Sequence, residues 1–246
     1  MNQEEFEDII NLHEEQNVKK HLLESFVIGK KNMFDTSSDL IIEKLLSEKE
    51  NTSKIISKLN KEQKEEGFEI ISYELDNYFR IEELKCLSEM KVIYLYRFFE
   101  INLKQLLKIS FENINNRNLY KWDSIKTFLK NNNIDLKEIE SFTQINEIRE
   151  LNNSFKHSKY IENSLASKIT EFKNIEEIDY RHIESFYKRV KDKPLNFLHD
   201  LSMKIYSELY DFNDEKIQKI SNKLTKRMDT NTAKSLIEKL KKSYQI

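Results

Sequence analysis

The chain has 246 residues, and its 41 Lys and Arg nearly balance its 43 Asp and Glu, so the formal net charge is −2. It contains only two glycines, one proline and one cysteine. The charge balance excludes a protein that binds polyanions over its whole surface, and the few glycines exclude Gly-rich phosphate loops and folds with many tight turns. Apolar residues at helical spacing predict an all-α helical bundle with additional N- and C-terminal helices.

Residues 1–66 are expected to form an N-terminal helical appendage. Two apolar stripes within residues 3–34 predict two helices: Phe6, Ile9, Ile10 and His13, then Leu22, Leu23, Phe26 and Val27. Thr36 to Asp39 is a predicted helix start. The buried side expected for the helix that follows consists of Leu40, Ile41, Leu45 and Leu46. A polar stretch from Ser47 to Glu66 then ends at Gly67, where we expect a hinge.

Residues 68–210 are expected to form the main bundle. Its first helix is apolar on most of its circumference from Met90 to Phe111, which predicts a central, buried helix. A narrow charged stripe runs along that helix and consists of Arg97, Glu100 and Lys104. A shorter helix is expected at Trp122 to Leu129, helical spacing continues across 161–190, and Pro194 is expected to open the last helix of the bundle.

Residues 211–246 are expected to form basic C-terminal helices. On the first of them, the apolar residues Ile217, Ile220 and Leu224 form one side. The opposite side is basic and consists of Lys219, Lys223, Lys226 and Arg227. Such a basic side is usually a solvated helix face, although it can also help to hold RNA.

A concentrated set of polar residues lies between Ile145 and Tyr160, on a predicted helix. At about 100° per residue, Asn153 lies about 40° round from Arg149, Lys156 about 20° the other way and His157 about 80°. These four side chains therefore share one side of the helix, while the apolar residues Leu151 and Phe155 face away from Arg149. The set is a candidate site; the alternative is an ordinary solvated helix face.

The segment from Trp122 through this helix, ending in Arg-Glu-Leu-Asn-Asn-Ser-Phe-Lys-His, resembles the HEPN-like helical proteins of bacterial abortive-infection and toxin systems. The match is an Arg, an Asn four residues on, then Lys-His, at Arg149, Asn153, Lys156 and His157. The resemblance covers about residues 68–210. It implies a HEPN-like bundle of four or more helices, a homodimer formed across the motif helices, and metal-independent RNA cleavage.

The chemistry of such cleavage defines possible roles for the motif residues. His157 is the candidate base for the 2′-hydroxyl proton, because histidine changes protonation in the physiological range. Arg149 and Lys156 would hold the phosphate, and Asn153 would orient either partner. Glu100 is a supporting candidate with two alternatives: a local ion pair with Arg97 or Lys104 one turn away, or a contact that fixes Arg149.

Other features of the sequence bear on compartment, cofactors and partners. The single Cys86, expected to pack within its apolar segment, favours a reducing compartment. The chain start is acidic and unlike a secretion signal, and no run approaches the about 20 apolar residues that cross a bilayer. We therefore expect a soluble cytoplasmic protein without membrane contact. The remaining histidines lack metal-ligand neighbours, so the sequence predicts no metal and no cofactor.

Two functions from different classes remain. The first is a phage-defence or toxin-type protein whose homodimer cleaves or binds RNA at a groove lined by the motif helix, with a neutralising or sensor protein as a further partner. The second is a non-catalytic helical adaptor that binds a protein partner through the same fold.

Overall fold

The computed structural model describes residues 14–15, 17–23, 33–61, 67–111, 114–115, 119–158 and 161–244. Within these ranges the regular elements are helices and there is no strand, so the all-α prediction is confirmed. The predicted stripe from Phe6 to His13 lies outside the described residues, as do Phe26 and Val27 of the second stripe.

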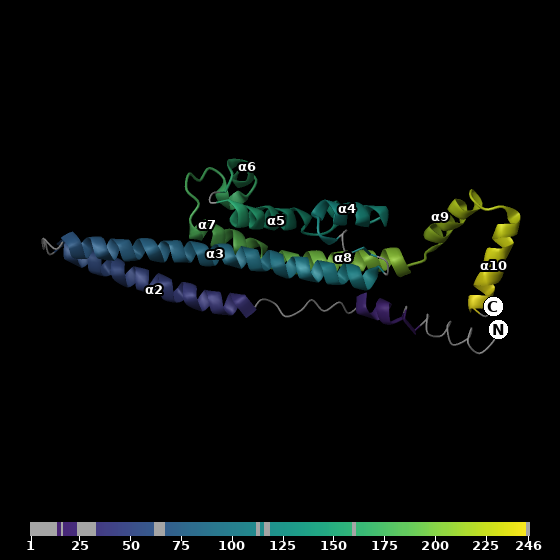
Figure 1. Ribbon diagram of the computed structural model, residues 1–246, viewed down its shortest axis with the longest axis horizontal. Coiled ribbons are helices and arrows are strands. Elements are labelled where there is room, and N and C mark those ends of the chain that lie inside the picture. Colours follow the sequence, from purple (N-terminus) through teal and green to yellow (C-terminus); the bar gives the residue numbers. More distant parts are fainter. Residues whose placement is uncertain are drawn as a thin grey trace.

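A long antiparallel hairpin forms one side of the molecule. Helix α2 (Met33–Lys61) runs beside the first half of α3 (Gly67–Ser110), and the closed end of this pair projects beyond the other helices (Figure 1). With 44 residues, α3 is about 66 Å long. Gly67, the expected break in the chain, is the first residue of α3.

The face that α2 turns toward α3 differs from the predicted one. Leu40, Ile41 and Leu46 are exposed, whereas the buried residues are Ser38, Ile42 and Thr52. These positions follow the seven-residue rhythm of two helices that wind along each other. Thr52 Oγ1 also accepts a hydrogen bond from Arg80 Nη1 of α3 at 3.1 Å. Of the predicted set, Leu45 is partly buried and lies on this seam. The prediction was wrong for the other three residues because it selected the most apolar stripe, whereas the seam also uses the small polar residues Ser38 and Thr52.

The second half of α3 is the centre of the core. It contacts α5 (Phe142–His157), α7 (Tyr180–Val190) and α8 (Lys193–Tyr210), and its inward side chains are fully buried. Phe99, for example, meets Phe197 of α8 edge-on, with 5.4 Å between the ring centroids. The expectation of a central, buried helix is confirmed for this half, although Met90, Tyr94 and Ile101 remain partly exposed.

Short elements connect the long helices. The helix predicted from Trp122 is α4 (Trp122–Asn131), and the turn η2 (Leu136–Glu138) leads from it into α5. The helical spacing predicted for 161–190 is only partly realised, as α6 (Asn163–Ala166), η3 (Thr170–Phe172) and α7. Asp179 ends the irregular stretch because its side chain caps the first turn of α7.

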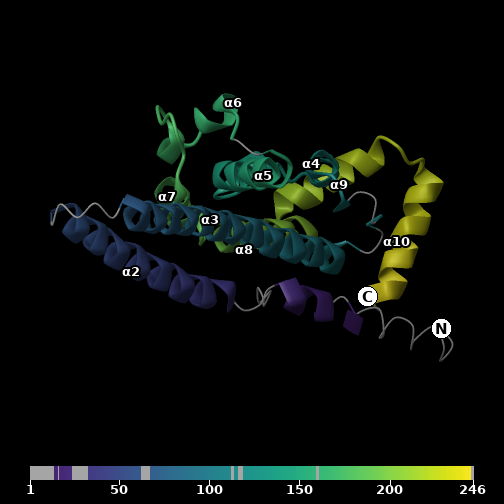
Figure 2. The ribbon, with the colours of Figure 1, turned by 60° about the vertical axis from the view of Figure 1, so that its left-hand side comes forward.

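Pro194 was predicted to open a helix, and it occupies the first turn of α8. Beyond α8, helices α9 (Asp214–Thr225) and α10 (Thr230–Tyr244) stand away from the bundle as a separate arm (Figures 1 and 2). Neither α9 nor α10 contains a buried residue. In the described part of the chain, no helix is both long and apolar enough to span a bilayer.

A buried lysine ties three helices of the bundle together. Lys91 of α3, only 3% exposed, places Nζ 2.9 Å from Asp39 Oδ1 of α2 and 2.9 Å from Glu184 Oε2 of α7. Its ammonium also lies 4.5 Å from the centroid of the Tyr187 ring. Burial opposes the charged form, but the hydrogen bonds that Lys91 donates to Glu184 and Asp39 prevail and raise the pKa of Lys91. Cys86 on the same helix is exposed, contrary to the expectation that it packs.

Candidate functional site

The helix α5 carries the predicted motif, and its apolar side fixes it to the bundle. Ile145, Ile148 and Leu151 are buried where α5 meets α3 and α8. At the other side of its first turns, Trp122 of α4 donates its indole N–H to Asn146 Oδ1 at 3.1 Å. Trp122 therefore fixes the N-terminal half of α5, as a partly buried anchor.

The four motif residues lie along the outward side of α5. Arg149 is partly buried, with 25% of its side chain exposed, while Asn153, Lys156 and His157 are exposed. His157 is the last residue of the helix. Asn153 Oδ1 accepts a hydrogen bond from Asn152 Nδ2 at 3.2 Å. The described neighbour Ser158 follows directly, whereas Tyr160 lies outside the described residues.

Arg149 is held but not saturated. Its Nη2 lies 3.4 Å from Glu150 Oε1, a long contact for a charge-assisted hydrogen bond. Its buried Nε has no hydrogen-bond partner within the described structure. The same holds for the buried Oδ1 of Asn152 and Oγ of Ser154 on this helix. A buried polar atom without a partner is costly, on the order of 1–3 kcal/mol.

Tyr96 of α3 lies in the electrostatic field of two candidate residues. Burial, strengthened by the negative charge of Glu100 and opposed by the positive charge of Arg149, raises the pKa of Tyr96 to about 12. Glu100 itself pairs with Lys104, with 2.7 Å between Oε1 and Nζ. Of the two alternatives for Glu100, the structure therefore contains the local ion pair with Lys104.

An ion-pair cluster on the opposite side of α5 was not predicted. Arg189 of α7 binds both carboxylate oxygens of Glu171, at 2.6 and 2.9 Å, and its Nη2 lies 2.9 Å from Glu147 Oε2 of α5. Burial of Glu171 opposes its ionisation, yet the hydrogen bonds from Arg189 lower the pKa of that carboxyl. No sequence spacing relates these residues, because three separate elements bring them together.

A cavity of about 440 Å³ adjoins the C-terminal end of α5. Phe155 and Ser158 form one wall, Lys85 and Glu89 of α3 another, and residues 161–183 close the rest. Burial raises the pKa of the Glu89 carboxyl, with the charge of Lys85 acting in the opposite direction. The end of the motif helix therefore borders a hollow that combines apolar walls with one partly buried acid.

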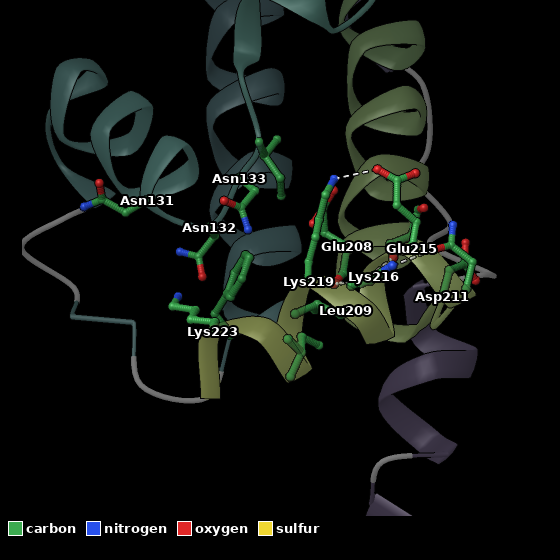
Figure 3. A pocket seen from close by; sticks show the side chains of 15 residues that line it. Asn131, Asn132, Asn133, Glu208, Leu209, Asp211, Glu215, Lys216, Lys219 and Lys223 are labelled. Atoms are coloured by element: carbon green, nitrogen blue, oxygen red, sulfur yellow. Dashed lines mark hydrogen bonds and ion pairs between the residues drawn. The ribbon is translucent and has the colours of Figure 1, made fainter. Parts of the chain in front are cut away.

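A larger cavity of about 690 Å³ lies at the other end of the bundle (Figure 3). Its lining comes from the end of α4 and the loop after it, from the end of α8 and from most of α9, together with Phe111; α5 does not contribute. Lys219, which points into it, pairs with Glu215 at 2.8 Å, and Lys216 donates to the carbonyl of Ser207 at 3.0 Å. Lys216 and Lys219 therefore already have partners, and the cavity includes no motif residue.

The motif face therefore carries a guanidinium, an amide, an ammonium and an imidazole on one side of α5. These groups suit an anion such as a phosphodiester, with the imidazole available for proton transfer. Comparison of the chain with protein-family models, with curated proteins and with solved structures gives no match.

Proposed function

We propose that the protein is a HEPN-like phage-defence or toxin-type protein that binds RNA at the motif face of α5 and cleaves it without a metal ion. The observation that carries the proposal is Arg149: within the described residues its guanidinium makes one long contact, from Nη2 to Glu150 at 3.4 Å, and a quarter of the side chain is exposed. A phosphate would complete its hydrogen bonds, since Arg binds phosphates with a planar, forked set of donors.

Three further side chains support the proposal, since they lie exposed on the same side of the helix. Lys156 would add a second positive charge, Asn153 would orient the backbone of the RNA, and His157 would accept the 2′-hydroxyl proton. A homodimer across α5 would place a second His157 near the same phosphate, which supplies the general acid as well as the base.

The experiment compares the full chain with His157→Ala on total RNA in the presence of a chelator. Removal of a general base is expected to reduce the cleavage rate at least about 100-fold. His199→Ala is the matched control, because His199 is an exposed histidine on α8, outside the motif. Equal cleavage by wild type and His157→Ala would contradict the assigned role of His157.

A second candidate function is a non-catalytic adaptor, and the closed end of the α2–α3 hairpin favours it. Apolar side chains are exposed on α3 there, namely Phe68, Ile71, Leu75, Tyr78 and Phe79, which are 52–88% exposed. Such contiguous apolar surface is typical of protein interaction sites. If the protein is only an adaptor, neither wild type nor His157→Ala will cleave RNA, whereas Phe68→Ser/Ile71→Ser will abolish binding to its protein partner.

A further inference from the structure

The arm formed by α9 and α10 contains an apolar groove. The groove has a volume of about 770 Å³ and is lined mainly by aliphatic side chains from both helices, including Ile217, Ile220, Leu224, Leu236, Ile237 and Leu240. Ile217 and Ile237 are 51% and 52% exposed. Helices of 12 and 15 residues are marginal in water unless an apolar face is covered. The arm is therefore expected to bind an apolar ligand of its own.

The charge of the arm limits what that ligand can be. Residues 212–246 carry nine Lys or Arg and four Asp or Glu, a net charge of +5, in a chain whose net charge is −2. A second copy of the arm would bring like charges together, which is unfavourable. An acidic amphipathic helix fits this site, because its apolar side matches the groove and its negative charge matches the positive residues around it.

The N-terminus of this chain has these properties. Residues 1–18 contain six Asp or Glu and no Lys or Arg. Phe6, Ile9 and Ile10 follow the i, i+3, i+4 spacing of a helix-in-groove ligand. A helix over residues 3–13 would be about 16 Å long, and the 12-residue α9 is about 18 Å long. Residues 1–13 themselves lie outside the described structure.

The described residues that follow bring this segment within reach of the groove. Lys19 lines a cavity of about 580 Å³ together with Phe212 and Tyr244, and Phe212 also lines the groove. Leu23 is buried in the core, and its carbonyl accepts a hydrogen bond from Ser202 Oγ of α8 at 3.2 Å. Lys19 and Leu23 thus lie at the end of the bundle from which α9 and α10 extend.

We propose that the groove between α9 and α10 is a docking site for residues 3–13 of the same chain, which bind as an acidic amphipathic helix with Phe6, Ile9 and Ile10 in the groove. The docked segment would neutralise much of the positive charge of the arm. This inference is independent of the RNA-related function proposed for α5, because it involves no motif residue.

Amide hydrogen exchange on the full chain tests the proposal. In the variant Phe6→Ser/Ile9→Ser/Ile10→Ser, peptides that cover α9 and α10 are expected to exchange at least about tenfold faster than in wild type. Val18→Ser is the matched control, since Val18 is a 57% exposed apolar residue outside the stripe. Unchanged exchange in peptides from α3 and α8 verifies that the core stays folded. Equal exchange of α9 and α10 in wild type and the triple variant would overturn the proposal.

Zero-length crosslinking of wild type supplies a second readout. A carbodiimide is expected to join carboxylates of residues 4–8 to lysines of α9 and α10. A mixture of ¹⁵N-labelled and unlabelled protein separates links within one chain from links between two. Crosslinks found only between labelled and unlabelled chains would assign the groove to the N-terminal segment of a second copy. If no crosslink of either kind joins residues 4–8 to α9 or α10, docking is contradicted.

Discussion

Arg149 and Glu100 have different environments, and the difference predicts different mutational effects. Arg149 is partly buried with an incomplete set of hydrogen bonds, whereas Glu100 makes a half-exposed ion pair with Lys104 one turn along the same helix. Exposed pairs of this kind contribute about 0.5 kcal/mol or less. The two residues are therefore separable by substitution.

Arg149→Lys is expected to keep the fold and to weaken RNA binding at least about tenfold, because an ammonium cannot replace a planar, forked guanidinium. Binding is measured by titration of labelled RNA, with thermal unfolding as the check on the fold. Lys137→Gln, which removes an exposed positive charge far from the motif in sequence, should change binding little. If Arg149→Lys binds RNA like wild type, Arg149 does not contact the phosphate.

Lys91→Met is expected to destabilise the protein by about 3 kcal/mol, since it leaves the carboxylate of Glu184, 15% exposed, without its cation. For a chain of this size the melting temperature should fall by roughly 6–12 °C. Adding Glu184→Gln should recover part of the loss. Lys44→Met, at an exposed i, i+4 pair, is the control that should stay near wild type.

Single residues show where sequence reasoning succeeded and where it had no information. Pro194 was predicted at a helix start because its fixed backbone angle suits a first turn. Lys91 was missed, because its partners Asp39 and Glu184 are 52 and 93 residues away and only tertiary packing brings them together. Cys86 was assigned to the core from its apolar neighbours, yet it falls on the exposed side of α3.

At the scale of elements, the cluster of Arg189, Glu171 and Glu147 joins α7, η3 and α5 and so supports the motif helix from behind. The pKa of Glu171 is lower in the folded state than its unfolded value of about 4.5. This carboxylate therefore stabilises the folded state at every pH above about 4.5. The contribution is lost as the pH falls through the lower folded value.

Glu171→Gln should therefore cost about 2 kcal/mol at neutral pH and little in strong acid, where the wild-type carboxylate is itself protonated. Chemical unfolding at a series of pH values measures the difference between the two curves. Glu176→Gln, in the neighbouring irregular segment, serves as the control for charge alone. A difference that stays constant down to the acid limit would show that the ion pair is not its cause.

The predicted helices also differ in how well the apolar pattern alone located them. The period of apolar residues sufficed for α4 and for the buried half of α3, because one stripe in each was clearly dominant. It failed for most of α2, whose buried residues are Ser38, Ile42 and Thr52. It also predicted too much helix between residues 161 and 179. There Leu165, Ile169 and Phe172 are buried, but they lie in or beside short helical turns.

At the scale of the whole molecule, the homodimer remains a prediction. Light scattering at micromolar concentration should give about twice the chain mass of 29.7 kDa if two motif helices pair. Asn153→Arg should then favour the monomer, since it places bulk and like charge at the expected two-fold axis. Phe68→Ser at the distant hairpin end should leave the mass unchanged. A single species near the chain mass in wild type would contradict the paired site.

The length of α3 has a consequence for synthesis of the chain. Phe99 is complete in α3 about 100 residues before its ring partner Phe197 in α8 has been made. At about 5–20 residues per second, roughly 5–20 s pass between the two events. During that interval the residues of α2 and α3 are already present, but the apolar side of α3 lacks the later helices that cover it in the folded protein. The apolar side of α3 is therefore covered only after α7 and α8, which are made later, have been synthesised.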